Sequence, residues 1–277
     1  MIFNGEVDRY QGFHVNLKDV KQFKDITVDE FELSLKEALD DWVKKYRCSW
    51  FEVGLQLTHF LPVLAKFGYV FHHTKTEYVS MNKWLSPSEP KNVPDYAFTN
   101  IGVGGLVIDK DNRVLVVKER HNLGIKMWKF PGGYSIQGEE FGETAIREVR
   151  EETGIDCQFE SVIAFRHIHK LAFDCSDIYM VCHLKPLGSV MKGSGSLEIS
   201  KCNYELDDCQ WIPVDELRPQ LSAFNRYILE KFVMSQSAGV MIGLKEIPVN
   251  IPQFKHIKQQ TYSIHQFNKQ LQDNKGS

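Results

Sequence analysis

The sequence lacks the marks of several large protein classes. Its six cysteines include no C-x-x-C pair, which argues against a zinc ribbon or a disulfide scaffold and favours a reducing compartment. No apolar run approaches the roughly 18 residues of a membrane span. The formal net charge of −3 provides no general basic field, so a nucleic-acid partner is not expected. The first ten residues are too polar and acidic for a signal or transit peptide, and we expect a cytosolic protein, with the nucleus as a second compartment.

What is present fits two compact α/β domains and a linker. A chain of 277 residues with 43% hydrophobic and 25% charged residues can bury two cores. Residues 86–95 contain three prolines and several turn formers without periodicity, which is typical of a linker. We therefore expect one domain over residues 1–85, a second over 96–235, and a mildly basic tail over 236–277 that is partly disordered.

The sequence of residues 1–85 predicts strands and helices in the order β, α, β, α, β-β. Thr27 and Glu30 form a capping box, and apolar residues follow from Val28 at helical spacing, so a helix is expected there. A second, short helix is expected over 58–67. His72 and His73 are adjacent on a predicted strand, where neighbouring side chains point to opposite faces. We therefore expect that they cannot both face one metal ion. The expected strands cover residues 6–16, 49–57, 69–74 and 77–85.

The sequence of residues 96–235 predicts strands, a helix, more strands and a final helix, in that order. Strands over 99–108 and 113–118 are expected to form a hairpin-like pair. The glycines of GVGG (102–105) are not followed by a nucleotide-binding pattern, and a strand packed closely under a helix explains them better. A Gly/Ser-rich loop over 188–200 is of the kind that closes over a site. The remaining elements are strands over 158–168, 177–185 and 208–212 and a helix over 221–235.

The strongest chemical signal is residues 133–155, GYSIQGEEFGETAIREVREETGI. Glu148, Glu151 and Glu152 lie at helical spacing i, i+3 and i+4, so they share one narrow face. Three carboxylates there repel one another unless a hard divalent cation sits among them, because Mg²⁺ and Mn²⁺ prefer oxygen ligands. Arg147 follows Glu139 by eight residues and can brace that carboxylate and a clustered Glu together. The alternative is an ordinary acidic surface helix.

The stretch resembles the Nudix box, G-x5-E-x7-R-E-U-x-E-E-x-G-U, where U is a bulky aliphatic residue. Segments such as FHHTKTEYVSMNKWL, WKFPGG and CQWIPVDEL are similar to the Nudix subgroup that has a pre-Nudix domain, which includes plant ADP-ribose/NADH pyrophosphatases and an animal branch. The similarity covers about residues 5–235. Every fixed position of the box is filled, by Gly133, Glu139, Arg147, Glu148, Val149, Glu151, Glu152, Gly154 and Ile155.

This resemblance implies a fold and an assembly. The C-terminal domain is expected to be a Nudix α/β/α sandwich with a mixed sheet. The N-terminal domain is expected to resemble half of an acetyltransferase fold and to be used in a homodimer. Acetyl transfer itself is not expected, because residues 1–85 show no glycine loop for coenzyme A.

The resemblance also implies metal-dependent hydrolysis of a pyrophosphate bond. Mg²⁺, with Mn²⁺ as a substitute, would be held by Glu148, Glu151, Glu152 and a backbone carbonyl at Gly132 or Gly133. Arg147, Glu148 and Glu152 are the expected catalytic residues of the box.

A further loop carboxylate is expected to act as the base, and three residues are candidates for contact with base or phosphate. Glu205, six residues before Trp211, is the first candidate for the base and Glu198 is the reserve. The substrate-contact candidates, each equally well explained as structural, are Trp128, Arg120 and Arg166.

The substrate is less firmly indicated than the reaction. ADP-ribose or NADH is expected, although the proline that bacterial-type ADP-ribose hydrolases show about fifteen residues past the box is absent, as is the SQPWPFP signature of NADH-type enzymes. Other nucleoside diphosphate derivatives, including capped RNA and coenzyme A, are the alternatives within the family. A regulatory or interaction protein with weak or no catalysis is the alternative outside it, and the intact box argues against that.

Overall fold

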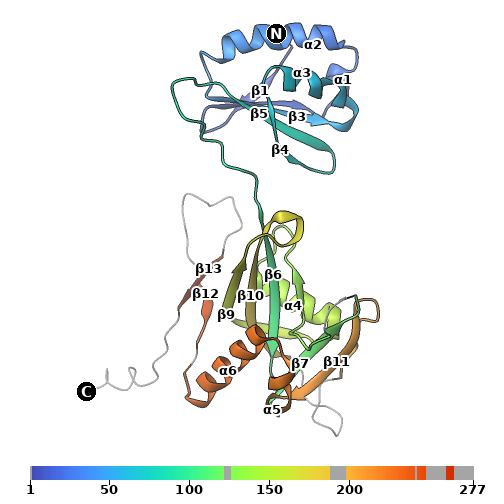
Figure 1. Cartoon of the computed structure of the whole chain (residues 1–277), viewed down its shortest axis with the longest axis vertical. Coiled ribbons are helices and arrows are strands. Elements are labelled where there is room, and N and C mark those ends of the chain that lie inside the picture. The colour runs from blue at the N-terminus through green and yellow to red at the C-terminus, as the bar shows by residue number, and fades with distance from the viewer. Residues whose placement is uncertain (1, 122–125, 188–197, 241, 248–259, 265–277) are drawn as a thin grey trace, which may run out of the picture. The chain divides into compact units, whose positions relative to one another are not determined.

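The computed structural model describes residues 2–121, 126–187, 198–240, 242–247 and 260–264. The chain divides into two compact units, Met1–Phe98 and Thr99–Ser277 (Figure 1). Within the described part of the chain, no helix is both long and apolar enough to cross a membrane. The six cysteines are all free, and four of them are buried. The four buried cysteines therefore serve as small apolar residues.

The N-terminal unit is a five-stranded mixed sheet with helices on one face. The strand order is β1-β2-β3-β5-β4, in which β2 and β3 are parallel and the other pairs are antiparallel. The strands are β1 (Gly5–Val7), β2 (Gly12–Leu17), β3 (Cys48–Gly54), β4 (Val70–Thr74) and β5 (Tyr78–Trp84). The helices are α1 (Val20–Phe23), α2 (Val28–Trp42), the 3-10 turn η1 (Leu55–Phe60) and α3 (Leu61–Lys66).

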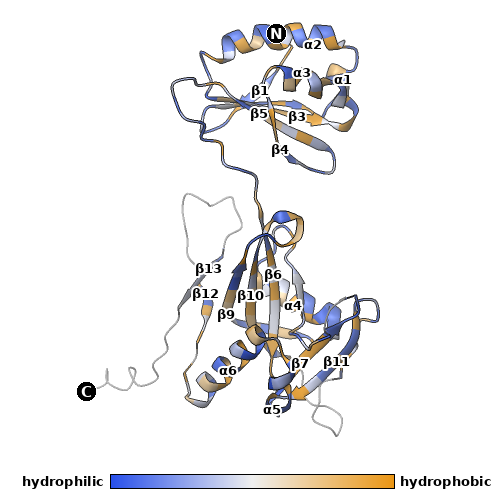
Figure 2. Ribbon diagram, in the orientation of Figure 1, coloured by the Kyte–Doolittle hydropathy of each residue, from blue (hydrophilic) through white to orange (hydrophobic). Residues whose placement is uncertain are grey.

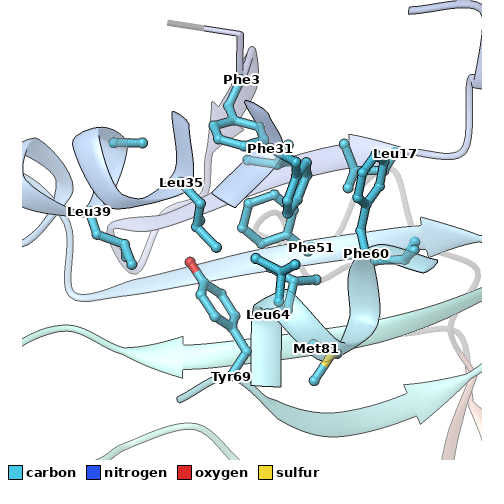
Figure 3. Close-up of a cluster of buried hydrophobic side chains, with 14 of the residues drawn as sticks. Phe3, Leu17, Phe31, Leu35, Leu39, Phe51, Phe60, Leu64, Tyr69 and Met81 are labelled. Carbon is cyan, nitrogen blue, oxygen red and sulfur yellow. The ribbon is translucent and has the colours of Figure 1, made fainter. Parts of the chain in front are cut away.

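Helix α2 forms as the sequence predicts. Thr27 and Glu30 make both bonds of the capping box, so the predicted start of the helix is confirmed. Hydrophilic and hydrophobic residues alternate along α2 in Figure 2, and its buried residues are Phe31, Leu35, Ala38, Leu39 and Trp42. Phe31 and Leu35 of this helix pack with Phe51 of β3 in the buried core of the unit (Figure 3).

Contrary to the prediction, the side chains of His72 and His73 do not point to opposite faces of the strand. Their Nδ1 atoms lie 2.7 Å apart, so the two rings meet on one side of the sheet. The cause is an irregularity in the pairing of β4 with β5, because the register shifts between Phe71 and His73. A bulge of this kind breaks the strict alternation of side chains on which the prediction depended. His73 also stacks on Tyr96, with ring centroids 4.7 Å apart.

The C-terminal unit contains a six-stranded mixed sheet and a two-stranded sheet. The first has the order β13-β12-β9-β10-β6-β8, with β6 and β10 parallel, and the second pairs β7 with β11. The strands are β6 (Thr99–Val107), β7 (Arg113–Glu119), β8 (Gly132–Tyr134), β9 (Cys157–Ile168), β10 (Ser176–Pro186), β11 (Leu206–Pro213), β12 (Leu244–Ile247) and β13 (Thr261–Ile264).

Helices α4 and α6 cover opposite faces of the larger sheet (Figure 1). Ala145 and Val149 of α4 belong to one buried cluster, and Leu229 and Phe232 of α6 belong to another. The unit therefore has the two-faced packing of a layered α/β fold. Its helices and 3-10 turns are α4 (Phe141–Thr153), η2 (Ala172–Asp174), α5 (Val214–Leu217), η3 (Arg218–Gln220) and α6 (Ala223–Ser237).

The predicted hairpin over 99–108 and 113–118 is wrong, although both strands exist. Strand β6 lies inside the six-stranded sheet, between β10 and β8, whereas β7 pairs with β11. The turn between them is closed by an isolated antiparallel bridge between Ile108 and Val114 and by a hydrogen bond of 3.0 Å from the Asp109 N–H to the Arg113 carbonyl. The chain therefore leaves one sheet and enters the other at this turn.

The glycines of GVGG are explained by close packing. A Cβ on Gly105 would lie 2.7 Å from Val149 of α4, which confirms the prediction of a strand close under a helix. Gly102 and Gly104 face the other side, where the ring of Tyr179 occupies the space of their missing side chains. The run is therefore structural and is not a nucleotide loop.

Part of the C-terminal tail is ordered into strands. Strand β12 pairs with β13, and Leu244 of β12 is bonded in register with Val162 of β9, so the tail extends the six-stranded sheet. The ring of Tyr262 in β13 packs on Phe141 at a centroid distance of 5.0 Å. Residues 248–259 and 265–277 of the predicted tail, and residues 188–197 of the predicted loop, lie outside the described residues.

Candidate active site

Helix α4 carries the acidic cluster and is fixed at both ends. Glu140 and Glu143 form a capping box at its start, and Gly154 ends it with a left-handed φ of 74°. Ala145 and Val149 are fully buried against the sheet. Because these apolar residues fix the rotation of the helix, the positions of its glutamates are fixed as well.

Glu148 and Glu152 lie against the loop that precedes the helix. The Gly132 N–H donates a hydrogen bond of 2.9 Å to Glu152 Oε2. The Glu148 carboxylate fills the space beside Gly133, because a Cβ there would lie 2.7 Å from both of its oxygens. The glycine loop therefore serves to let two carboxylates approach its backbone.

Arg147 connects the loop, the helix and the cluster. Its Nε and one terminal nitrogen donate to the two oxygens of Glu139, at 2.6 and 2.8 Å. Its other terminal nitrogen donates to Glu148 at 2.8 Å and to Glu151 at 3.0 Å. This confirms the prediction that one arginine braces the loop carboxylate and orients a glutamate of the cluster. These bonds hold the pKa of Glu139 down at about 2.

An open cavity of about 400 Å³ adjoins Glu148, Glu152 and the glycine loop. Its wall contains four carboxylates, two basic side chains and the glycine loop, supplied by Glu119, His121, Lys129, Gly132, Gly133, Glu148, Glu152 and Glu205. The structure therefore brings together residues that are up to 86 positions apart, from Glu119 to Glu205. Of the predicted site residues, Gly133, Glu148, Glu152 and Glu205 lie in this wall.

The cavity is electrostatically suited to a cation. Glu152 is 4% exposed, and its burial raises the pKa of the carboxyl to about 7. Glu148 and Glu205 add to that rise, and Lys129 opposes it. Burial also raises the pKa of Glu148. Crowded, poorly hydrated carboxylates of this kind are stabilised by a positive charge among them.

The comparison with known proteins gives the family. The NUDIX domain model matches residues 98–232, and the Nudix hydrolase domain model matches residues 3–85. Nucleoside diphosphate-linked moiety X motif 6 of Xenopus laevis is 42% identical over 160 residues, which are 57% of this chain and 69% of that protein. The chain belongs to the Nudix hydrolase family. Nudix hydrolases generally use a divalent metal and act on nucleoside diphosphate derivatives.

Two further relatives align with a larger share of this chain than the Xenopus protein does. The mouse protein named Nucleoside diphosphate-linked moiety X motif 6 is 36% identical over 217 residues, which are 77% of this chain and 66% of that protein. Nudix hydrolase 8 of Arabidopsis thaliana is 34% identical over 193 residues, which are 69% of this chain and 50% of that protein. The chain thus spans between half and two thirds of the length of these two relatives.

The other residues predicted to bind metal or substrate do not line the 400 Å³ cavity. The side chain of Glu151 is exposed to solvent and forms an ion pair with Arg147. Glu198 is exposed as well. Arg120 extends toward Asp207. The guanidinium of Arg166 lies 5.0 Å from the ring centre of Phe224. Their roles in metal or substrate binding stay predictions.

Trp128 has a different place. It is 4% exposed, its indole N–H donates to Gln220 Oε1 at 3.2 Å, and the ammonium of Lys118 lies 4.1 Å from its ring centre. Trp128 therefore closes one side of a smaller neighbouring cavity and belongs mainly to the core.

Lys129 and Glu119 are site residues that the sequence did not reveal. They form an ion pair in the cavity wall. Lys129 also lowers the pKa of Glu152, so its charge acts on the cluster. The one available signal was the position of Lys129 in WKFPGG, directly before the glycine loop. Glu119 carried none, because it ends a strand whose partner is distant in the sequence.

Proposed function

We propose that this Nudix protein hydrolyses the pyrophosphate bond of a nucleoside diphosphate derivative, with ADP-ribose and NADH as the first candidates. The observation that supports this most is the cavity in which Glu148, Glu152 and Glu205 meet beside the Gly132–Gly133 backbone. A diphosphate carries its negative charge on oxygens that need a cation and a fixed geometry for attack by water.

The donor set fits Mg²⁺, with Mn²⁺ as a substitute. Within the described residues, no group of three acidic, Cys or His side chains is placed to hold a metal ion by itself. Mg²⁺ is commonly held by one or two carboxylates together with waters and substrate phosphates, so the pair of Glu148 and Glu152 is sufficient. Glu151 and the carbonyl of Gly133 are the further candidates for ligands. When bound, such an ion offsets phosphate charge and makes a bound water more acidic.

The residues of the chain have separate tasks in this proposal. Arg147 holds Glu148 in place through a hydrogen bond of 2.8 Å, and the Gly132 N–H holds Glu152 through one of 2.9 Å. Lys129 places a positive charge beside the phosphates. Glu205, exposed in the cavity wall, takes the proton of the attacking water.

The test is phosphate-coupled turnover with Mg²⁺ or Mn²⁺ on ADP-ribose, NADH, coenzyme A and capped RNA, for the parent and Glu152→Gln. We expect one of these compounds to be cleaved, and the variant to lose about 10²-fold or more, as when a metal ligand is removed. A chelator should abolish the same activity. If nothing on this panel turns over, a regulatory or interaction role replaces the enzyme proposal.

We also propose that the N-terminal unit, residues 1–85, mediates a homodimer. The support is the resemblance to the pre-Nudix subgroup, and the likeness to half of an acetyltransferase fold stays a prediction. Light scattering after size exclusion, on the full chain and on residues 99–277, tests it. Loss of the dimer in the shorter chain would support the proposal, and a dimer in both would contradict it.

A further inference from the structure

The N-terminal unit has a cavity that the proposed function does not use. It measures about 330 Å³ and is lined by residues between Asp8 and Pro94. Gly12 of β2, Cys48 of β3 and Trp84 of β5 are neighbours in register and form one side of it. Because the first two have small side chains or none, they leave room between the larger ones that also line this N-terminal cavity.

The linker closes the N-terminal cavity and is held at both ends. Residues 92–94 line the cavity. Before them, the carbonyl of Glu89 accepts a hydrogen bond of 3.0 Å from the indole N–H of Trp84. At their end, the carbonyl of Pro94 accepts a hydrogen bond of 2.9 Å from His72 Nε2. The cavity is therefore built into the fold of this unit, because hydrogen bonds fix the segment that closes it.

Three aromatic rings line the N-terminal cavity, those of Tyr10, Trp50 and Trp84. Two of them already attract a cation. The guanidinium of Arg9 lies 4.7 Å from the ring centre of Tyr10, and that of Arg47 lies 5.2 Å from the ring centre of Trp84. The face of an aromatic ring carries partial negative charge, so it draws positive groups toward it. The aromatic lining therefore suits a cation better than an anion.

Asp8 adds a formal negative charge to the same lining. Its carboxylate accepts hydrogen bonds from the backbone N–H groups of Tyr10 and Gly12, at 2.7 and 2.8 Å, and lies 2.8 Å from His14 Nε2. Burial by itself raises the pKa of Asp8, but these hydrogen bonds together outweigh it and hold the pKa below its usual value. Asp8 is therefore ionised at neutral pH.

The negative charge of Asp8 is not cancelled within the lining. The other charged side chain there, Arg47, is paired with Glu89 at 2.7 Å, so those two charges largely balance each other. The thiol of Cys48 responds to the remaining charge. Burial raises its pKa to about 11, the charge of Asp8 adds to that rise, and Lys91 opposes it by less. The potential beside Cys48 is therefore negative.

We propose that the N-terminal cavity binds a trimethylammonium group. A primary ammonium is strongly hydrated and has three N–H donors, which aromatic rings cannot satisfy. A trimethylammonium group has no N–H, presents apolar methyl groups to the rings and keeps its positive charge for Asp8. Such a group belongs either to a small free molecule such as choline or to a trimethylated lysine side chain. The proposal is independent of the proposed hydrolysis.

The first experiment compares choline with a neutral dimethylbutanol of the same shape, in which a carbon atom replaces the nitrogen. Calorimetry on the full chain should show choline bound at least about 10-fold more tightly. The indole N–H signals of Trp50 and Trp84 should shift in NMR spectra, whereas those of Trp128 and Trp211 should not. Equal binding of the two compounds, or no binding of choline, would overturn the proposal. This comparison needs no variant to fold.

Two variants test the lining itself. Asp8→Asn keeps the size of the side chain and removes its charge, and it should weaken choline by about 10-fold without affecting the neutral compound. Tyr10→Ala removes a ring that is 61% exposed and should weaken choline by about 3- to 10-fold. The matched control is Tyr227→Ala, which removes another exposed ring with a cation, Lys231, 5.5 Å from its centre. If both test variants bind choline as the parent does, this cavity is not the site.

A peptide with trimethyllysine, compared with the same peptide carrying lysine, distinguishes the two sources of the group. Binding of the methylated peptide at least about 10-fold more tightly than choline would identify a protein as the source. Choline bound as tightly as the methylated peptide would identify a small molecule. Either result supports the proposal, whereas a preference for the unmodified peptide would contradict it.

Discussion

Arg147 and Glu139 are joined by two parallel hydrogen bonds that tie the loop before α4 to the middle of that helix. Both side chains are mostly shielded from water, with 23% and 20% of their surfaces exposed. A paired geometry of this kind is stronger than a single surface ion pair. It fixes the loop that carries Gly132 and Gly133 against the helix that carries Glu148 and Glu152.

This pair should make the stability of the C-terminal unit depend on pH. The pKa of Glu139 is lowered from 4.5 to about 2, chiefly by the hydrogen bonds from Arg147. Because the folded state lowers this pKa, the stabilisation is complete above pH 4.5 and is lost as the pH falls toward 2. We expect Glu139→Gln to cost ~1–3 kcal/mol at pH 7 and almost nothing near pH 2. Urea unfolding of parent and variant between pH 2 and 7 measures this. A difference that stays constant over that range would contradict the prediction, and exposed Glu216→Gln is the control.

Gly133→Ala should impair turnover without unfolding the protein. The added methyl group would lie 2.7 to 2.8 Å from the Glu148 carboxylate, which must move away. Moving one metal ligand is expected to lower kcat by about 10- to 100-fold. Tyr134→Ala is a suitable control, because it truncates the exposed neighbouring side chain, which does not line the cavity. Equal rates for Gly133→Ala and the parent would show that the contact with Glu148 is not important.

Glu148 and Glu151 should differ in importance although both belong to the box. Glu148 faces the cavity with 13% of its side chain exposed, whereas Glu151 is 59% exposed and lies outside the wall. We expect Glu148→Gln to lower metal-dependent turnover by about 10²-fold or more and Glu151→Gln by less than about 10-fold. Turnover measured across a Mg²⁺ titration separates the two. Losses of equal size would mean that Glu151 is drawn into the metal site.

Tyr262 should stabilise the protein through its ring more than through its hydroxyl. The ring packs on Phe141, whereas the hydroxyl makes long bonds of 3.4 and 3.3 Å to Glu140 and Glu246 and also bonds with the Phe141 backbone. Burial of an aromatic ring stabilises the folded state by more than such long hydrogen bonds do. Tyr262→Ala should cost ~1–2 kcal/mol in unfolding free energy and Tyr262→Phe less than ~0.5 kcal/mol. Thermal unfolding of both variants decides this, and a larger loss for the Phe variant would reverse the argument.

The sequence predicted the elements whose causes are local. The capping box that fixes the start of α2 consists of Thr27 and Glu30, which are only three positions apart in the sequence. The bracing of Glu139 by Arg147 follows from spacing on one helix and the loop before it. These features depend on neighbours in the chain, so residue order alone contains the information.

The errors and omissions have non-local causes. The partners of β6 and β7 come from β10 and β11, far along the chain, and the bulge at His72 and His73 depends on pairing with β5. Glu119 reaches the cavity through the pairing of β7 with β11. No periodicity records contacts of this kind, so they become visible only when the sheets are assembled.

The GVGG run shows how much information a plain stretch of sequence can hold. Gly105 is limited by Val149 and Leu184 on one face of the sheet, and Gly104 by Tyr179 on the other. An added carbon at Gly105 would push against Val149 of helix α4, whereas an added carbon at Gly104 would displace the Tyr179 ring of the neighbouring strand β10. Gly105 therefore sets how closely the sheet approaches the helix that carries Glu148 and Glu152, and Gly104 sets where a large ring lies on the opposite face of the same sheet.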